Sequence, residues 1–162
     1  MFNDPLINRI IDFILNIGIE VTAGIFEEET VLPGIKIDSG KIIVDEKKLL
    51  YPGDLLHEAG HIAVKPGSER FNTSINVGND PAEEMMSMAW SYAAAVNIGI
   101  PPEVVFHPHG YHGQSVSLIR NFQSNNCIGL PMLQWVGMCA DYKNAPSLGV
   151  SPFPFMIKWL RD

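Results

Sequence analysis

Four segments of the chain carry apolar residues at the spacing of a helix that buries one face. Proline and glycine mark several of their ends, because proline suits a first helical turn and glycine the residue after a last one. Gly18 ends the first segment, and Gly99 follows the third. We therefore expect helices over residues 5–17, 54–64, 81–98 and 115–123, with a helical turn beginning at Pro101-Pro102.

Acidic residues stand where these helices begin. Asp4 precedes Pro5, and Asp54 follows Pro52-Gly53, so both are predicted to be N-caps. Asp80-Pro81-Ala82-Glu83 has the spacing of a capping box, in which Glu83 reaches back to the cap residue. Lys65-Pro66-Gly67 is expected to end the second helix.

Strand patterns are confined to a short part of the chain. Residues 35–38 and 41–44 are rich in isoleucine and valine and flank Ser39-Gly40, which predicts a hairpin. Residues 24–34 are expected to be irregular, and residues 66–80 to form a loop with room for one short strand near Ser74–Val77. The proline-rich tail predicts short helices and turns. The fold class is therefore α+β, a single domain spanning residues 1–162 with a small antiparallel or mixed sheet and additional helices at both ends.

Composition and charge exclude two classes of partner. The 162 residues carry 11 Lys and Arg against 18 Asp and Glu, a net charge of -7, and no basic run, so no nucleic-acid partner is expected. Charged and polar residues interrupt every apolar stretch, so no membrane association is expected. The start of the chain lacks the features of a secretory signal, and Cys127 and Cys139 are typical of buried thiols. These features predict a cytoplasmic location.

The second expected helix contains the sequence His57-Glu58-Ala59-Gly60-His61. Residues four apart on a helix differ by about 40° around the axis, so the two imidazoles lie on one face and can bind a single metal ion. Glu58 would then act as the general base on a water molecule at the open coordination position. A catalytic zinc site needs a third protein ligand as well.

Two known ways of supplying that ligand do not fit this chain. A third histidine in an extended box would require Gly at position 64 and His at position 67, where the chain has Val64 and Gly67. A cysteine upstream of the box is also absent, since both cysteines lie downstream.

Glu83 and Glu84 lie 22 and 23 residues beyond His61, at the start of the next expected helix. This arrangement resembles the gluzincin zinc peptidases, in which a second helix donates a glutamate to the metal. Glu84 is preferred because Glu83 has a capping role and because Glu84-Met85-Met86-Ser87 matches the Glu-x-x-Ser of thermolysin-like members. Glu83 stays the alternative ligand.

The resemblance covers residues 35–95, the expected zincin-like core, and implies a function. It implies a Zn²⁺ cofactor held by His57, His61 and Glu84, a peptide or protein substrate, and hydrolysis through Glu58. The hairpin before the box corresponds to the family's substrate-binding edge strand. An oxyanion donor should come from beyond the glutamate helix, with His112 and Tyr111 as first choices and His109 next.

The chain departs from the thermolysin pattern at three positions. Glu83 replaces an Asn, Met88 replaces an Asp that would support a histidine, and Asp54 replaces an apolar residue or Thr. Met85, Met86, Met88 and Trp90 are assigned to the core.

Two other interpretations remain open: a zinc-binding regulatory or interaction module with a degenerate site, and a chain in which the box is coincidental. The aromatic segment 153–160 is expected to pack the chain end onto the body, and an exposed version could form a homo-oligomer surface.

Overall fold

The computed structural model describes residues 2–73, 80–124 and 126–162. Its elements are α1 (Pro5–Asn16), β1 (Val21–Ala23), β2 (Ile35–Asp38), β3 (Lys41–Val44), α2 (Asp54–Val64), α3 (Pro81–Ile98), α4 (Ser115–Gln123), α5 (Leu130–Trp135) and α6 (Ala145–Leu148), with 3₁₀ turns at Arg70–Asn72, Pro102–Val104 and Tyr111–Gly113. The four long helices match the expected ones in place and length. The combination of these helices with a small mixed sheet confirms the α+β class.

Two of the expected helix caps form as predicted. The Asp4 carboxylate accepts a hydrogen bond from the Leu6 N–H at 2.7 Å, and the Asp80 carboxylate accepts one from the Ala82 N–H at 2.9 Å. At the other end of α3, Gly99 takes a left-handed conformation with φ of 66°, which glycine adopts without steric cost.

Two other cap assignments were wrong. Asp54 is the first residue inside α2, and Gly53 occupies the cap position without a side-chain bond. The Asp54 carboxylate is turned instead toward the buried ring of His107. Glu83 directs its carboxylate to His61 on α2 and to Lys65, which directly follows α2, rather than back to its own cap. In both cases the local sequence predicts that the carboxylate caps its own helix, but the carboxylate instead contacts a residue that is distant in the sequence.

The predicted hairpin is confirmed, with β2 antiparallel to β3 in a register that pairs Ile35 with Val44 and Asp38 with Lys41. Ser39 and Gly40 form the two-residue turn with φ of 53° and 75°, the left-handed geometry that such tight hairpins require. β1, which was not predicted, adds parallel to β3 and gives the strand order β1-β3-β2. In the part of the chain that the structure describes, β2 therefore forms one edge of the sheet. The strand expected near Ser74–Val77 lies outside the described residues.

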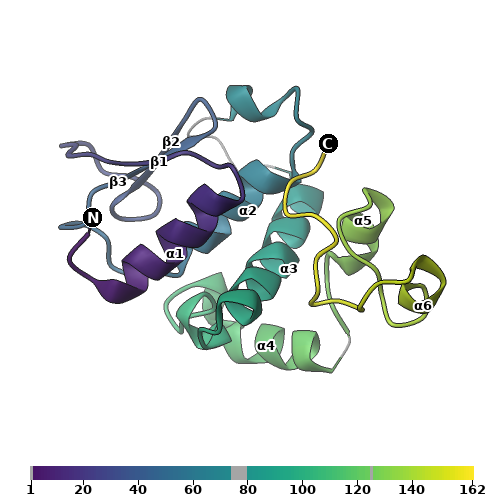
Figure 1. Ribbon diagram of the computed structural model, residues 1–162. Helices are drawn as coiled ribbons and strands as arrows, with labels where there is room; N and C mark the ends of the chain where they lie inside the picture. The colour runs from purple at the N-terminus through teal and green to yellow at the C-terminus, as the bar shows by residue number, and fades with distance from the viewer. Residues whose placement is uncertain (1, 74–79, 125) are drawn as a thin grey trace.

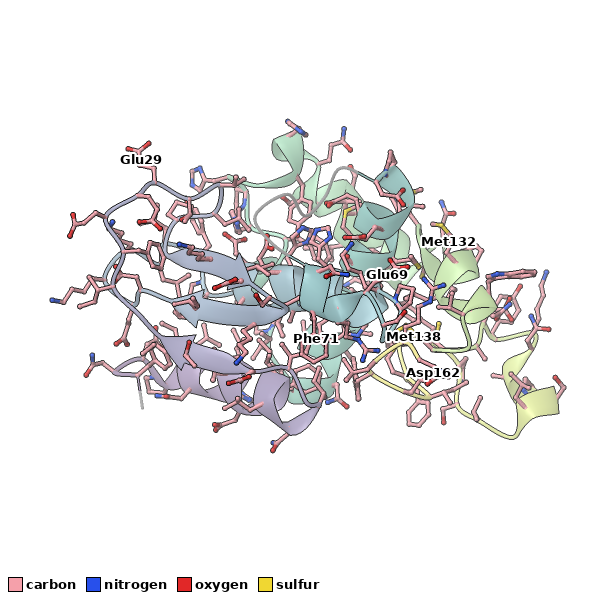
Figure 2. All side chains as sticks on the ribbon, turned by 90° about the horizontal axis from the view of Figure 1, so that it is seen from above. Glu29, Glu69, Phe71, Met132, Met138 and Asp162 are labelled. Atoms are coloured by element: carbon pink, nitrogen blue, oxygen red, sulfur yellow. The ribbon has the colours of Figure 1, made fainter. Side chains whose placement is uncertain are left out.

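The sheet lies at one end of the molecule and α5 and α6 at the other, with α2 and α3 between them (Figures 1 and 2). α2 and α3 approach closely, because a Cβ atom on Gly60 would lie only 3.0 Å from the backbone oxygen of Ser87. Met86, Met88 and Trp90 on α3 are buried, as predicted. This close contact brings the first turn of α3 beside the box histidines.

The C-terminal segment packs onto the helical body as expected. The Trp159 ring meets Phe13 edge-on with ring centroids 4.9 Å apart, and its backbone oxygen accepts a hydrogen bond from the Trp90 indole at 2.9 Å. Phe155 and Ile157 in the same segment remain about half exposed. Within the described parts of the chain, every helix is too short or too polar to cross a bilayer.

Candidate metal centre

α2 places the two box histidines side by side. Their Nε2 atoms lie 3.1 Å apart, and the ring planes are nearly perpendicular. His61 is almost fully buried, with 2% of its side chain exposed, whereas His57 lies nearer the surface at 12%. As the spacing of four residues predicted, the helix directs one nitrogen of each ring to the same point.

Glu84 completes the set from the first turn of α3. One of its carboxylate oxygens lies 3.1 Å from His61 Nε2, and the other lies 3.5 Å from His57 Nε2. In a tetrahedral zinc site with bonds of about 2.0 Å, neighbouring ligand atoms are about 3.3 Å apart. The three side chains thus present two imidazole nitrogens and a carboxylate at distances that suit a common metal ion, and they form a possible metal-binding group among the described residues.

The charges around these nitrogens favour a cation. Burial alone would lower the pKa of His61, but hydrogen bonds from its ring to the carboxylates of Glu83 and Glu84 outweigh burial and raise this pKa to about 9. Burial would raise the pKa of Glu84, yet its contacts with His57 and His61 hold that pKa far below the ordinary value. Carboxylates therefore stabilise a positive charge between the two rings, and a proton or a divalent cation can supply it.

Each histidine also has a partner on its outer nitrogen. His61 Nδ1 lies 3.1 Å from a Glu83 carboxylate oxygen, and His57 Nδ1 lies 3.1 Å from the Tyr111 hydroxyl. When Nε2 binds a metal, the ring proton sits on Nδ1 and needs an acceptor, which is the usual arrangement for metal-binding histidines. Tyr111 was predicted as an oxyanion donor, but in this structure its hydroxyl contacts the far side of a predicted ligand.

A buried pair holds the segment that carries Tyr111. His107 Nε2 lies 3.1 Å from an Asp54 carboxylate oxygen, and the His107 ring stacks on Tyr51 with centroids 3.8 Å apart. The Ser115 hydroxyl donates to the His107 backbone oxygen at 2.7 Å. These contacts tie the start of α2 to the segment from residue 107 to residue 115.

The Glu58 side chain lines a cleft on the surface of the protein. The cleft is lined by the edge strand β2, by the preceding loop and by Glu58 itself, and its lining is mostly apolar (residues Glu28, Glu29, Thr30, Val31, Leu32, Ile35, Lys36, Ile37 and Glu58). Figure 2 shows Glu29 at the outer limit of this loop, beyond the sheet. Burial raises the pKa of Glu58 above its ordinary value. The cleft therefore offers a place for a ligand beside the carboxylate predicted to act as the base.

Two other predicted residues stay apart from the cluster. His112 is exposed, and within the described residues no hydrogen bond or ion pair joins it to the metal-binding group. His109 is exposed and lies over Tyr51 with ring centroids 5.7 Å apart. Both Tyr111 and His112 have positive φ angles near 50°, which is uncommon for residues other than glycine and often marks functional loops.

The sequence named Glu83 and Tyr111, but it did not reveal their contacts with the outer nitrogens of the box histidines or the buried pair of Asp54 and His107. Only one signal was available. Acidic residues at positions 54 and 83 depart from the thermolysin pattern, and both of them contact a histidine in the structure.

No protein-family model matches the chain, and no curated protein or solved structure matches it significantly. The function must therefore be argued from the site itself.

Proposed function

We propose that this protein is a zinc-dependent peptidase of the gluzincin type, with a zincin-like domain. The observation that carries the proposal is the convergence of His57, His61 and Glu84, together with Glu58, which directly follows His57 and lines the cleft. The two nitrogens and the carboxylate are a donor set that zinc accepts, as in the His₂Glu sites of known zinc peptidases. Three protein ligands would leave the fourth position of a tetrahedral zinc ion for water or substrate.

In this proposal each residue has a distinct task. His57, His61 and Glu84 would hold the zinc ion, which would polarise the scissile carbonyl and lower the pKa of water. Glu58 takes a proton from the attacking water and passes it to the leaving amine. Its raised pKa suits this exchange, because a base works best when its pKa approaches the working pH. The oxyanion-donor roles of His112, Tyr111 and His109 remain predictions.

Among the described residues, no strand pairs with the outer edge of β2, which favours a polypeptide substrate. The Asp45 N–H donates to the Gly34 backbone oxygen, so the alternation of an antiparallel ladder turns the polar groups of Lys36 and Asp38 toward β3. The N–H and C=O of Ile37 consequently point to the open side of the sheet, where the cleft lies. An extended peptide can add to such an edge through main-chain hydrogen bonds. Its scissile bond would then lie near Glu58.

The test compares wild-type protein with Glu58→Gln after each is stripped of metal and loaded with zinc. Both should bind one zinc ion per chain, because Glu58 is not a ligand. Only the wild type should cleave members of a mixed peptide library, as followed by mass spectrometry. If both bind zinc and neither cleaves any peptide, the non-catalytic zinc-module interpretation replaces this one. If neither binds zinc, the box is coincidental.

A further inference from the structure

On the side away from the metal-binding group, the side chains of Lys65, Glu83 and His61 form a continuous series of polar contacts that begins near the surface. Lys65 Nζ lies 2.7 Å from one carboxylate oxygen of Glu83, and the other oxygen lies 3.1 Å from His61 Nδ1. We propose that Glu83 and Lys65 form a positioning pair, which fixes the His61 imidazole and sets how tightly the site holds zinc. This inference rests on the metal centre of the proposed function, but not on peptide hydrolysis.

The position of Glu83 favours one tautomer of the His61 imidazole. A carboxylate accepts hydrogen bonds, so it favours the imidazole form that carries its proton on Nδ1 and leaves Nε2 free for the metal. Glu83 and Glu84 are consecutive residues of α3, yet they contact opposite nitrogens of the same ring. One turn of one helix thus supplies both a metal ligand and the support for a second ligand.

At position 83 this chain has a carboxylate where the thermolysin pattern has an Asn. The thermolysin pattern has an Asp at position 88 to support a histidine, and this chain has a buried methionine, Met88, there. Glu83 stands one turn and a half earlier on α3 and reaches the ring directly. The outer nitrogen of His61 therefore meets the carboxylate of Glu83, the residue directly before the predicted ligand Glu84.

Lys65 keeps Glu83 in this arrangement. It lies directly after α2, so its ion pair with Glu83 joins the end of the box helix to the start of α3. By holding one carboxylate oxygen, Lys65 leaves the other directed at His61. Its positive charge also offsets the repulsion between the neighbouring carboxylates of Glu83 and Glu84, whose side chains are 12% and 34% exposed.

The experiment measures zinc affinity of the full chain by competition with a chromophoric chelator. Loss of an outer partner typically weakens metal binding by about 10–100-fold, and Glu83→Ala should fall in this range. Lys65→Met should weaken binding by a smaller factor, and Lys65→Arg should restore it. Lys158→Met serves as the matched control, because Lys158 pairs with Asp162 at the chain end and should leave zinc affinity unchanged.

A second measurement separates positioning from general damage to the fold. In zinc-loaded wild type, ¹⁵N-edited NMR should show a slowly exchanging proton on His61 Nδ1, and Glu83→Ala should lose this signal while the amide spectrum of α2 is kept. Wild-type affinity together with an unchanged His61 signal in Glu83→Ala overturns the proposal. If that variant does not fold, the lysine variants decide: equal affinity of Lys65→Met and wild type also overturns it.

The outcomes distinguish this inference from the function on which it rests. A wild type that binds no zinc refutes the metal centre and, with it, both proposals. A wild type that binds zinc and cleaves nothing removes the peptidase, whereas the effect of Glu83→Ala on zinc affinity would still establish the positioning pair.

Discussion

Zinc should stabilise the folded protein, and Glu84→Ala should abolish most of that effect. The histidines lie on α2 and Glu84 on α3, so the three donors meet only when these helices pack together. A site that is absent from the unfolded chain adds its binding free energy to folding stability. At a free zinc concentration 100 times Kd, this contribution is about 2.7 kcal/mol.

The expected shift in melting temperature follows from the size of the chain. For 162 residues, each kcal/mol corresponds to about 2–4 °C, so wild type should gain about 5–11 °C. Loss of a partner that supports a ligand weakens metal binding by up to about 100-fold, and the loss of a direct ligand should weaken it by at least as much. At the same zinc concentration Glu84→Ala would then gain about 0.4 kcal/mol or less, a shift of about 1–2 °C.

Circular dichroism melts of chelator-treated protein, with and without zinc, measure both shifts. Glu20→Ala is the control, because Glu20 is an exposed partner of Lys41 on the sheet and should leave the wild-type shift intact. An equal shift in Glu84→Ala and wild type would show that Glu84 is not a ligand. No shift in wild type would refute the metal centre.

Two further substitutions test the segment that supports His57. Asp54→Ala leaves the buried His107 ring without its carboxylate partner and should cost about 1–3 kcal/mol of folding stability, measured by urea denaturation. An unchanged midpoint would contradict the buried pair. Tyr111→Phe removes only the hydroxyl that contacts His57 Nδ1, so zinc affinity should fall about tenfold by chelator competition, whereas Tyr142→Phe, which changes an exposed ring, should leave it at the wild-type value.

Helix positions could be predicted well because their signals are local. Apolar spacing and the glycines and prolines at the ends identified the segments of α1, α2, α3 and α4. The hairpin was equally local, since two β-branched runs flank a two-residue turn. β1 escaped prediction because its three residues are stabilised by parallel pairing with β3, about 20 residues away in the sequence.

The same division applies to the candidate site. His57, Glu58 and His61 could be identified from the sequence alone, since four residues of helix bring the two imidazoles together wherever α2 lies. The sequence also favoured Glu84 over Glu83 as the ligand, but only the packing of α2 on α3 shows which carboxylate meets Nε2 and which meets Nδ1.

The sequence by itself therefore determined the helices, the hairpin and the pair of histidines, all of which depend on residues a few positions apart. Only the tertiary structure decided what the acidic residues at helix starts do. Asp54 and Glu83 have the local pattern of caps, but a buried imidazole offers each a charged hydrogen bond that is largely shielded from water. Such a bond outweighs a solvent-exposed cap, and no local pattern records which histidine will lie nearby.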